Sequence, residues 1–167
     1  DKDYELNLNG NIFRILGVKG VGANSTVYLA VSKRDGSQHI LKEYNPQNIF
    51  IKKDDEGNIM LSTMNELEFE KYNSGLEKFK NAGLRQITIR NNYKALMNTT
   101  TNINCIYEAK NTVYIDMTVF EGESYDKIPY EDSIQDILLR IRAIAVAIKG
   151  YHDNGMLHLD IKPPNVF

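Results

Sequence analysis

The most informative stretch lies near the end of the sequence and reads His152-Asp153-Asn154-Gly155-Met156-Leu157-His158-Leu159-Asp160-Ile161-Lys162-Pro163-Pro164-Asn165. It follows a run with helical periodicity, which Gly155 is expected to end. Beyond that glycine, Asp160, Lys162 and Asn165 supply a carboxylate, an ammonium group and an amide at fixed spacing. These side chains are either ordinary residues of a polar loop or a set that handles a charged substrate. The elements before them distinguish the two interpretations.

Length and composition are those of one globular domain, or of one lobe and part of another. The chain has 167 residues, of which 42% are hydrophobic and 25% charged, which argues against wholesale disorder. Its 20 basic and 22 acidic residues leave a net charge of −2, and a protein that neutralises nucleic-acid phosphates normally has a basic excess. We therefore expect no nucleic-acid partner.

Cysteine content and hydropathy suggest a cytoplasmic protein. Cys105 is the single cysteine, so no disulfide forms within the chain, which fits a reducing compartment. The longest apolar run, Ala143 to Ile148, is far shorter than the roughly 20 residues that cross a bilayer. No membrane segment is expected. The sequence begins at Asp1 rather than Met and ends without a polar tail, so we expect a piece of a longer protein.

Strands dominate the first third of the chain and recur after residue 100. Each predicted strand is rich in β-branched and aromatic residues, and turn residues such as Arg34-Asp35-Gly36-Ser37 separate them. The sequence predicts five strands in all: Ile12–Lys19, Thr26–Ser32, Gln38–Tyr44, Ile103–Ala109 and Val113–Phe120.

Two helices are predicted, one on either side of the last two strands. The first runs from about Ser62 or Thr63 to Lys80, ends at Asn81-Ala82-Gly83 and has an apolar face. The second runs from about Ser133 to Asp153, with an apolar stripe of period 3.6. Residues 85–104 are rich in Asn and Thr, and we expect a loop or insertion with one short strand there. The apolar face of the first helix is Phe69, Tyr72, Leu76 and Phe79.

In this context residues 152–165 resemble the catalytic loop of eukaryotic-type Ser/Thr protein kinases, His-x-Asp followed five residues later by Asn. Five such identities recur by accident in a chain of this length with odds on the order of 10⁻⁴ or less. The resemblance extends over the whole chain. It implies an α+β fold in which residues 1–120 form a kinase-like small lobe, a five-stranded antiparallel sheet plus one helix. Residues 121–167 would be the hinge and the start of the large lobe. The identities are His158, Asp160, Lys162, Pro163 and Asn165.

The same resemblance implies roles for the loop residues, with ATP and Mg²⁺ as cofactors and a protein substrate that the sequence does not identify. Asp160 would accept the proton of the attacking hydroxyl, and Lys162 would offset charge on the transferred phosphoryl group. Asn165 would hold a magnesium ion. The Lys two residues after the Asp is typical of the Ser/Thr class.

A nucleotide site is implied in the strand-rich region. Gly20-Val21-Gly22-Ala23-Asn24-Ser25 is similar to the glycine-rich phosphate loop, with Ser25 in place of the third glycine. Lys42 stands where the family has its phosphate-binding lysine. The remaining positions would surround adenine. They are Val27 and Ile40 as the roof, Met117 as the gatekeeper, Val119 in the hinge and Phe167 as the floor.

The family pairs this lysine with a glutamate on the following helix, and three glutamates compete for that role here. Glu68 lies one helical turn before Tyr72, near the apolar face, whereas Glu66 and Glu70 point away from it. We therefore predict Glu68 as the partner of Lys42, with Glu66 in reserve.

Some positions depart from the family pattern and keep other functions open. Ser25, Ile40 and Leu159, the last in place of Arg, favour a pseudokinase-like nucleotide-binding or scaffold module. A small-molecule kinase of the aminoglycoside or choline type is a third possibility, but Lys162-Pro163 argues against it. No Asp-Phe-Gly motif follows Asn165. We therefore expect this chain to be a fragment that is inactive by itself and prone to self-association.

Overall fold

The computed structural model describes residues 4–93, 96, 100–120, 122–127, 133–157 and 161–166. The chain is divided into two compact units. The first comprises Asp1–Gln86 and Asn102–Val119, and the second Ile87–Thr101 and Phe120–Phe167. Each unit is described by itself.

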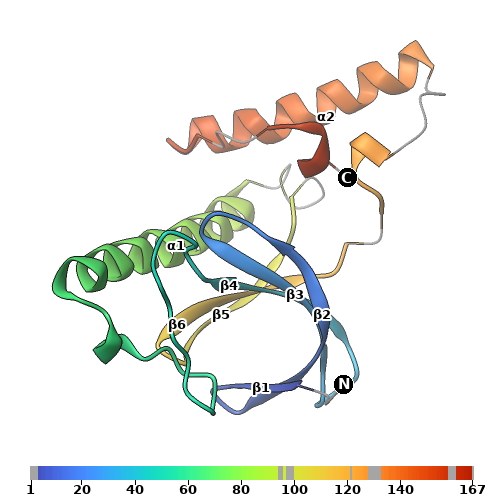
Figure 1. Ribbon diagram of the computed structural model, residues 1–167. Coiled ribbons are helices and arrows are strands. Elements are labelled where there is room, and N and C mark those ends of the chain that lie inside the picture. Colours follow the sequence, from blue (N-terminus) through green and yellow to red (C-terminus); the bar gives the residue numbers. More distant parts are fainter. Residues whose placement is uncertain are drawn as a thin grey trace. The chain divides into compact units, whose positions relative to one another are not determined.

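The first unit contains a curled antiparallel sheet with one long helix beside it (Figure 1), which confirms the predicted α+β class. Where five strands were expected, the sheet has six, in the order β1-β2-β3-β4-β6-β5. Their bounds are β1 Tyr4–Leu8, β2 Asn11–Val21, β3 Ser25–Ser32, β4 Gln38–Tyr44, β5 Ile103–Ala109 and β6 Thr112–Thr118.

Strand β1 is the one that the sequence prediction missed. It pairs with β2 through a tight turn in which Asn9 and Gly10 have φ angles of 54° and 90°. These left-handed conformations are those that Asn-Gly hairpins supply. Leu6 and Leu8 of β1 are buried against the inner face of the sheet. The extra strand therefore closes the small lobe's core, whose buried members are Leu6, Leu8, Phe13, Ala30, Leu41 and Tyr114.

A charged residue lies inside this core. Glu43 of β4 is 1% exposed, and its carboxylate accepts three hydrogen bonds. The Tyr28 hydroxyl donates over 2.7 Å, the Tyr114 hydroxyl over 2.9 Å and the Lys53 ammonium over 2.6 Å. Burial, followed by the Glu43 charge, raises the pKa of both tyrosines above its ordinary value. The cluster satisfies a buried charge and holds the segment around Lys53 against the sheet.

Replacing Glu43 by Ala is expected to lower the free energy of unfolding by about 3 to 5 kcal/mol, because the change leaves buried hydroxyl groups and Lys53 without their acceptor. Urea denaturation at constant m-value measures the loss. Glu5→Ala is the matched control, since Glu5 pairs with Lys33 at the surface and such pairs contribute at most about 1 kcal/mol. Equal losses in the two variants would contradict the assignment.

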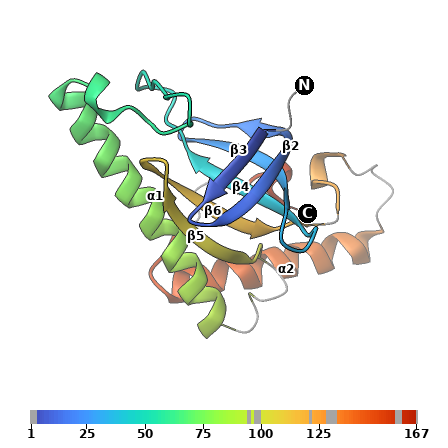
Figure 2. The same ribbon diagram turned by 90° about the horizontal axis from the view of Figure 1, so that it is seen from below.

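Helix α1, Glu66–Asn92, packs along the outer face of the sheet (Figure 2). Tyr72 meets Tyr44 of β4 with ring centroids 5.2 Å apart. The helix begins later than predicted, because Asn65, not Ser62 or Thr63, caps it. Residues 61–63 form a separate 3₁₀ turn.

The end of α1 was also predicted wrongly. The helix continues past Gly83 to Asn92, through part of the segment that was expected to be a loop. A Cβ atom at Gly83 would lie 2.9 Å from Ile106 Cδ1 and 3.0 Å from Ile115 Cδ1. The glycine therefore permits close approach of helix and sheet instead of ending the helix.

The second unit is built on helix α2, Ile134–Asp153, as predicted. Ser133 and Asp136 form a reciprocal capping box at its start. Gly150 lets the helix approach Tyr93 and Leu96, since a Cβ atom there would lie 2.8 Å and 3.0 Å from them. Among the described helices, none is long and apolar enough to span a membrane.

Candidate nucleotide site and catalytic loop

Strand register brings five of the predicted nucleotide-site residues together on one face of the sheet. Val27 pairs with Gly20 on one side and with Lys42 on the other. In the neighbouring row, Ile40 pairs with Met117. Residues two apart on a strand share a face, so the apolar side chains lie beside the lysine. Val27, Ile40 and Met117 are half-buried, as is Val119 just beyond β6.

The glycine-rich loop between β2 and β3 is a closed turn. The Gly22 amide donates to the Ser25 carbonyl over 2.8 Å. The carbonyls of Ala23 and Asn24 accept from the amides of Gln47 and Asn45, which fixes the tip of the loop. Within the described part of the chain, the Ala23 and Asn24 amides themselves have no acceptor. Free amides at such a turn suit phosphate oxygens, so this end of the sheet fits a nucleotide.

Lys42 projects from β4 toward helix α1. Its ammonium lies 5.8 Å from the centroid of the Phe79 ring, and burial lowers its pKa below the ordinary value. Among the described residues, no carboxylate oxygen lies within 4.0 Å of it. A half-buried ammonium that pairs with no carboxylate of the described residues is suited to receive an anionic ligand.

The structure does not pair Lys42 with Glu68. Glu68 lies in the first turn of α1, where its carboxylate accepts from the Asn65 amide over 3.1 Å and completes a capping box. The α1 residue that faces Lys42 is Phe79, a member of the predicted apolar face of the helix. Nothing in the helical pattern alone indicated which turn of α1 crosses β4.

The residues predicted to form a catalytic loop belong to the second unit. Asn165 ends a 3₁₀ turn, Pro163–Asn165, in which its amide donates to the Lys162 carbonyl over 2.9 Å. The Val166 carbonyl accepts from the Tyr125 amide over 2.7 Å. Asp160 and Phe167 lie outside the described residues, as do His158 and Leu159.

A magnesium site is not completed by the described residues. Mg²⁺ requires near-octahedral oxygen coordination, and Asn165 supplies one amide oxygen. No group of three His, Cys, Asp or Glu side chains able to hold a metal ion occurs in the parts of the chain that the structure describes.

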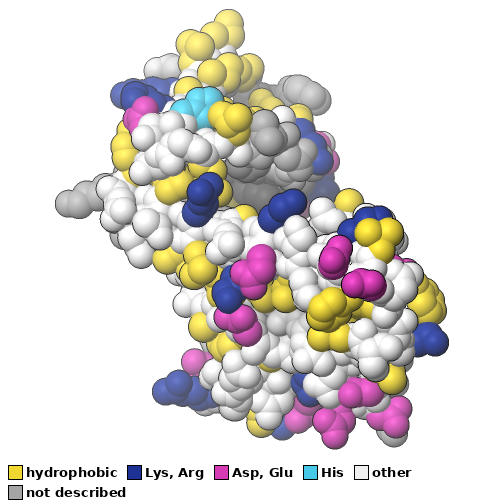
Figure 3. Space-filling view, turned by 90° about the vertical axis from the view of Figure 1, so that its left-hand side faces the viewer, with side chains coloured by type: hydrophobic (Ala, Val, Ile, Leu, Met, Phe, Trp, Pro, Cys, Tyr) yellow, Lys and Arg dark blue, Asp and Glu magenta, His cyan; other side chains and the backbone are white. Residues whose placement is uncertain are grey.

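Charged side chains of both signs are interspersed on the face shown in Figure 3. Individual pairs bind across elements of the first unit, such as Lys80 with Glu108 over 2.7 Å.

The fold of the first unit matches that of a protein-kinase small lobe, and comparisons with known proteins agree. No family model matches the chain. Over 152 residues, 89% of this chain, it is 31% identical to calcium/calmodulin-dependent protein kinase type 1 of Caenorhabditis elegans. The protein of the same name from Caenorhabditis briggsae is 40% identical over 63 residues, 36% of this chain and 18% of the relative. The chain is therefore similar to protein kinases in sequence and in fold.

Solved structures show the same fold. The apo form of PpkA-294 superposes with a TM-score of 0.72 at 21% identity, over 99% of this chain and 56% of that one. The kinase domain of Mycobacterium tuberculosis PknI gives a TM-score of 0.57 at 18% identity, over 97% of this chain and 57% of that one. The chain spans about half the length of these domains and 36% of the Caenorhabditis elegans relative.

Proposed function

We propose that this chain supplies the nucleotide-binding lobe and catalytic loop of an enzyme that transfers the γ-phosphoryl group of ATP to Ser or Thr hydroxyls of proteins. The observation that carries the proposal is the row Gly20, Val27 and Lys42, with Ile40 and Met117 beside it on one sheet face. This arrangement offers an apolar surface to adenine and a cation to the phosphates. The proposed location is cytoplasmic.

In this proposal the second unit supplies the chemistry. Asp160 positions the substrate hydroxyl and takes its proton, and Lys162 offsets charge that develops on the transferred group. Asn165 is one ligand of Mg²⁺, and the sequence contains no Asp-Phe-Gly carboxylate to complete that site. A polypeptide of these 167 residues is therefore expected to transfer no phosphate by itself.

Lys42→Met is expected to abolish the preference of the chain for ATP over adenosine, a loss of roughly tenfold or more, because the ammonium contacts phosphates and not the base. Calorimetric titration with ATP and with adenosine measures the preference. Lys33→Met is the matched control, since Lys33 lies at the surface with Glu5. An unchanged ratio in Lys42→Met would contradict the proposed phosphate contact.

The lowered pKa of Lys42 predicts that both stability and affinity for ATP depend on pH. The folded-state pKa of Lys42 is lowered by burial, so between that value and the ordinary 10.5 the unfolded chain holds more protons than the folded chain. The stability of the nucleotide-free chain therefore rises with pH through this window, while affinity for ATP falls as the ammonium loses its proton. Both dependences should be reduced in Lys42→Met, as thermal unfolding and calorimetry across the alkaline range would show.

A pseudokinase-like binding module is the second candidate. The contact of Lys42 with Phe79, in place of a carboxylate, favours it. One measurement distinguishes the two functions: within a complete kinase domain that contains this chain, a binding module would hold ATP without transferring phosphate.

A further inference from the structure

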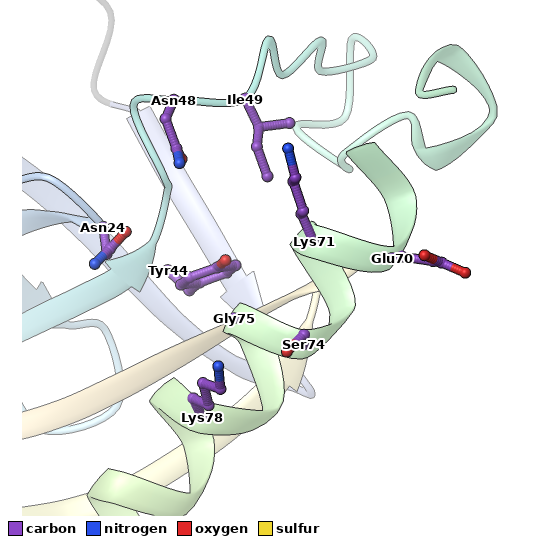
Figure 4. Close-up of a pocket in the computed structure, with 9 residues that line it drawn as sticks. All are labelled: Asn24, Tyr44, Asn48, Ile49, Glu70, Lys71, Ser74, Gly75 and Lys78. Carbon is purple, nitrogen blue, oxygen red and sulfur yellow. The ribbon is translucent and has the colours of Figure 1, made fainter. Parts of the chain in front are cut away.

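A pocket of about 400 Å³ opens between helix α1 and the segment that follows β4 (Figure 4). It lies wholly within the first unit and adjoins the sheet face that carries Val27, Ile40 and Met117, because Tyr44 follows Lys42 by two residues on β4. Three segments contribute its walls: the tip of the glycine-rich loop, residues 44–49 and one face of α1. The lining residues are Asn24, Tyr44, Asn48, Ile49, Glu70, Lys71, Ser74, Gly75 and Lys78.

Tyr44 gives the pocket a fixed polar group. The residue is 3% exposed, yet its hydroxyl makes no hydrogen bond within the described part of the chain. Burial raises the pKa of this hydroxyl, which therefore stays protonated and can donate. A Cβ atom at Gly75 would lie 2.0 Å from the hydroxyl oxygen. Glycine inside a helix costs roughly 1 kcal/mol relative to alanine, and here it makes room for that oxygen.

Two lysines lie one helical turn to either side of this point. Lys71, Ser74 and Lys78 are spaced at three and four residues, so they share one face of α1. No carboxylate oxygen of the described residues lies within 4.0 Å of either ammonium, unlike that of Lys80, which pairs with Glu108. The one acidic lining residue, Glu70, points away from the other side chains in Figure 4.

We propose that this pocket binds a dianionic phosphoryl group. Two ammonium groups supply charge, Ser74 and Tyr44 supply hydroxyl donors, and Asn24 and Asn48 supply amides. Charge-assisted hydrogen bonds from several donors of this kind favour phosphate over neutral ligands. The pocket adjoins the proposed nucleotide site, because Tyr44 shares the sheet face of Lys42 and Asn24 belongs to the glycine-rich loop, so the test includes ATP as a possible source of the phosphoryl group.

Four probes distinguish the possible sources of the group. They are the capped tripeptide Gly-phosphoserine-Gly, the same peptide without phosphate, inorganic phosphate, and ATP. Amide NMR shifts of ¹⁵N-glycine-labelled chain report binding at Gly75. A Gly75 shift with the phosphopeptide and not with the serine peptide supports the proposal. A stronger response to phosphopeptide than to inorganic phosphate identifies a phosphorylated polypeptide as the source, and the strongest response to ATP identifies the nucleotide.

Variants distinguish specific binding in this pocket from non-specific attraction of phosphate to a positively charged surface. Lys71→Gln and Lys78→Gln should each weaken phosphopeptide binding roughly tenfold by calorimetry, whereas Arg85→Gln, the same loss of one charge elsewhere on α1, should not. Tyr44→Phe keeps the packing and removes the hydroxyl, so it should weaken binding while leaving the unfolding midpoint unchanged. Absence of any phosphate-dependent shift at Gly75, or equal losses in the Arg85 and lysine variants, would overturn the proposal.

Discussion

Asp160→Asn, introduced into a complete kinase domain that contains this chain, is expected to lower the rate of phosphoryl transfer roughly 10²- to 10⁴-fold, the usual contribution of a positioned general base. The amide cannot take the proton of the substrate hydroxyl, although it occupies nearly the same volume. Affinity for ATP should change little, because the proposed contact of Asp160 is with the substrate hydroxyl. Steady-state transfer from γ-labelled ATP to a protein substrate, together with nucleotide titration, measures both quantities.

Asp153→Asn is the matched control for this prediction. Asp153 lies seven positions earlier, at the end of α2, where it pairs with Lys149 at the surface. Loss of that pair should leave transfer within about a factor of two, because an exposed helix pair contributes little. Turnover at the unmodified rate in Asp160→Asn would refute the proposed role of Asp160. Equal losses in the two variants would indicate a structural effect.

The strands of the small lobe could largely be predicted from the sequence, because alternation and turn residues are local signals. The β2–β3 and β3–β4 pairs and the β5–β6 hairpin occur close to the expected positions. The missed strand β1 also had a local signal. Tyr4 to Leu8 alternates in polarity, and Asn9-Gly10 is the preferred two-residue hairpin turn.

Helix α1 shows where local rules fail. Gly83 was expected to end the helix, since glycine commonly lies just beyond a helix C-terminus. In the structure it is instead the point of closest approach to Ile106 and Ile115. Gly75 has an equivalent relation to Tyr44. Such contacts join residues far apart in the sequence, and a local pattern contains no information about them.

The same limit applies to the candidate site. Strand pairing brings Val27, Lys42, Ile40 and Met117 together, and it was the family resemblance, not a local pattern, that had grouped them. The choice of Glu68 required knowing which turn of α1 crosses β4. The angle of about 100° between successive residues predicts which side of a helix a residue lies on, but not which turn of the helix lies opposite a given strand. In the structure the Glu68 carboxylate accepts a hydrogen bond from the Asn65 amide at the start of α1.

We expect a polypeptide of these 167 residues to self-associate at micromolar concentration through helix α2. The first half of this helix exposes large apolar side chains on one face, with Ile134 79%, Leu138 60% and Ile141 57% exposed. Contiguous apolar patches above a few hundred Å² are uncommon on monomers and mark interaction surfaces. Burial contributes roughly 25 cal/mol per Å², so pairing two such faces is strongly favourable.

Leu138→Glu should therefore raise the dissociation constant of the self-associated chain by roughly 30-fold or more, because it places a charge at the centre of the apolar face. Ala143→Glu adds the same charge about 140° around the helix, at an exposed position, and should leave association unchanged. Sedimentation velocity over a concentration series compares the three proteins. A stable monomer of the unmodified chain at micromolar concentration would show that the α2 face does not mediate association. Dissociation by Ala143→Glu as readily as by Leu138→Glu would place the contact on a different face of the helix.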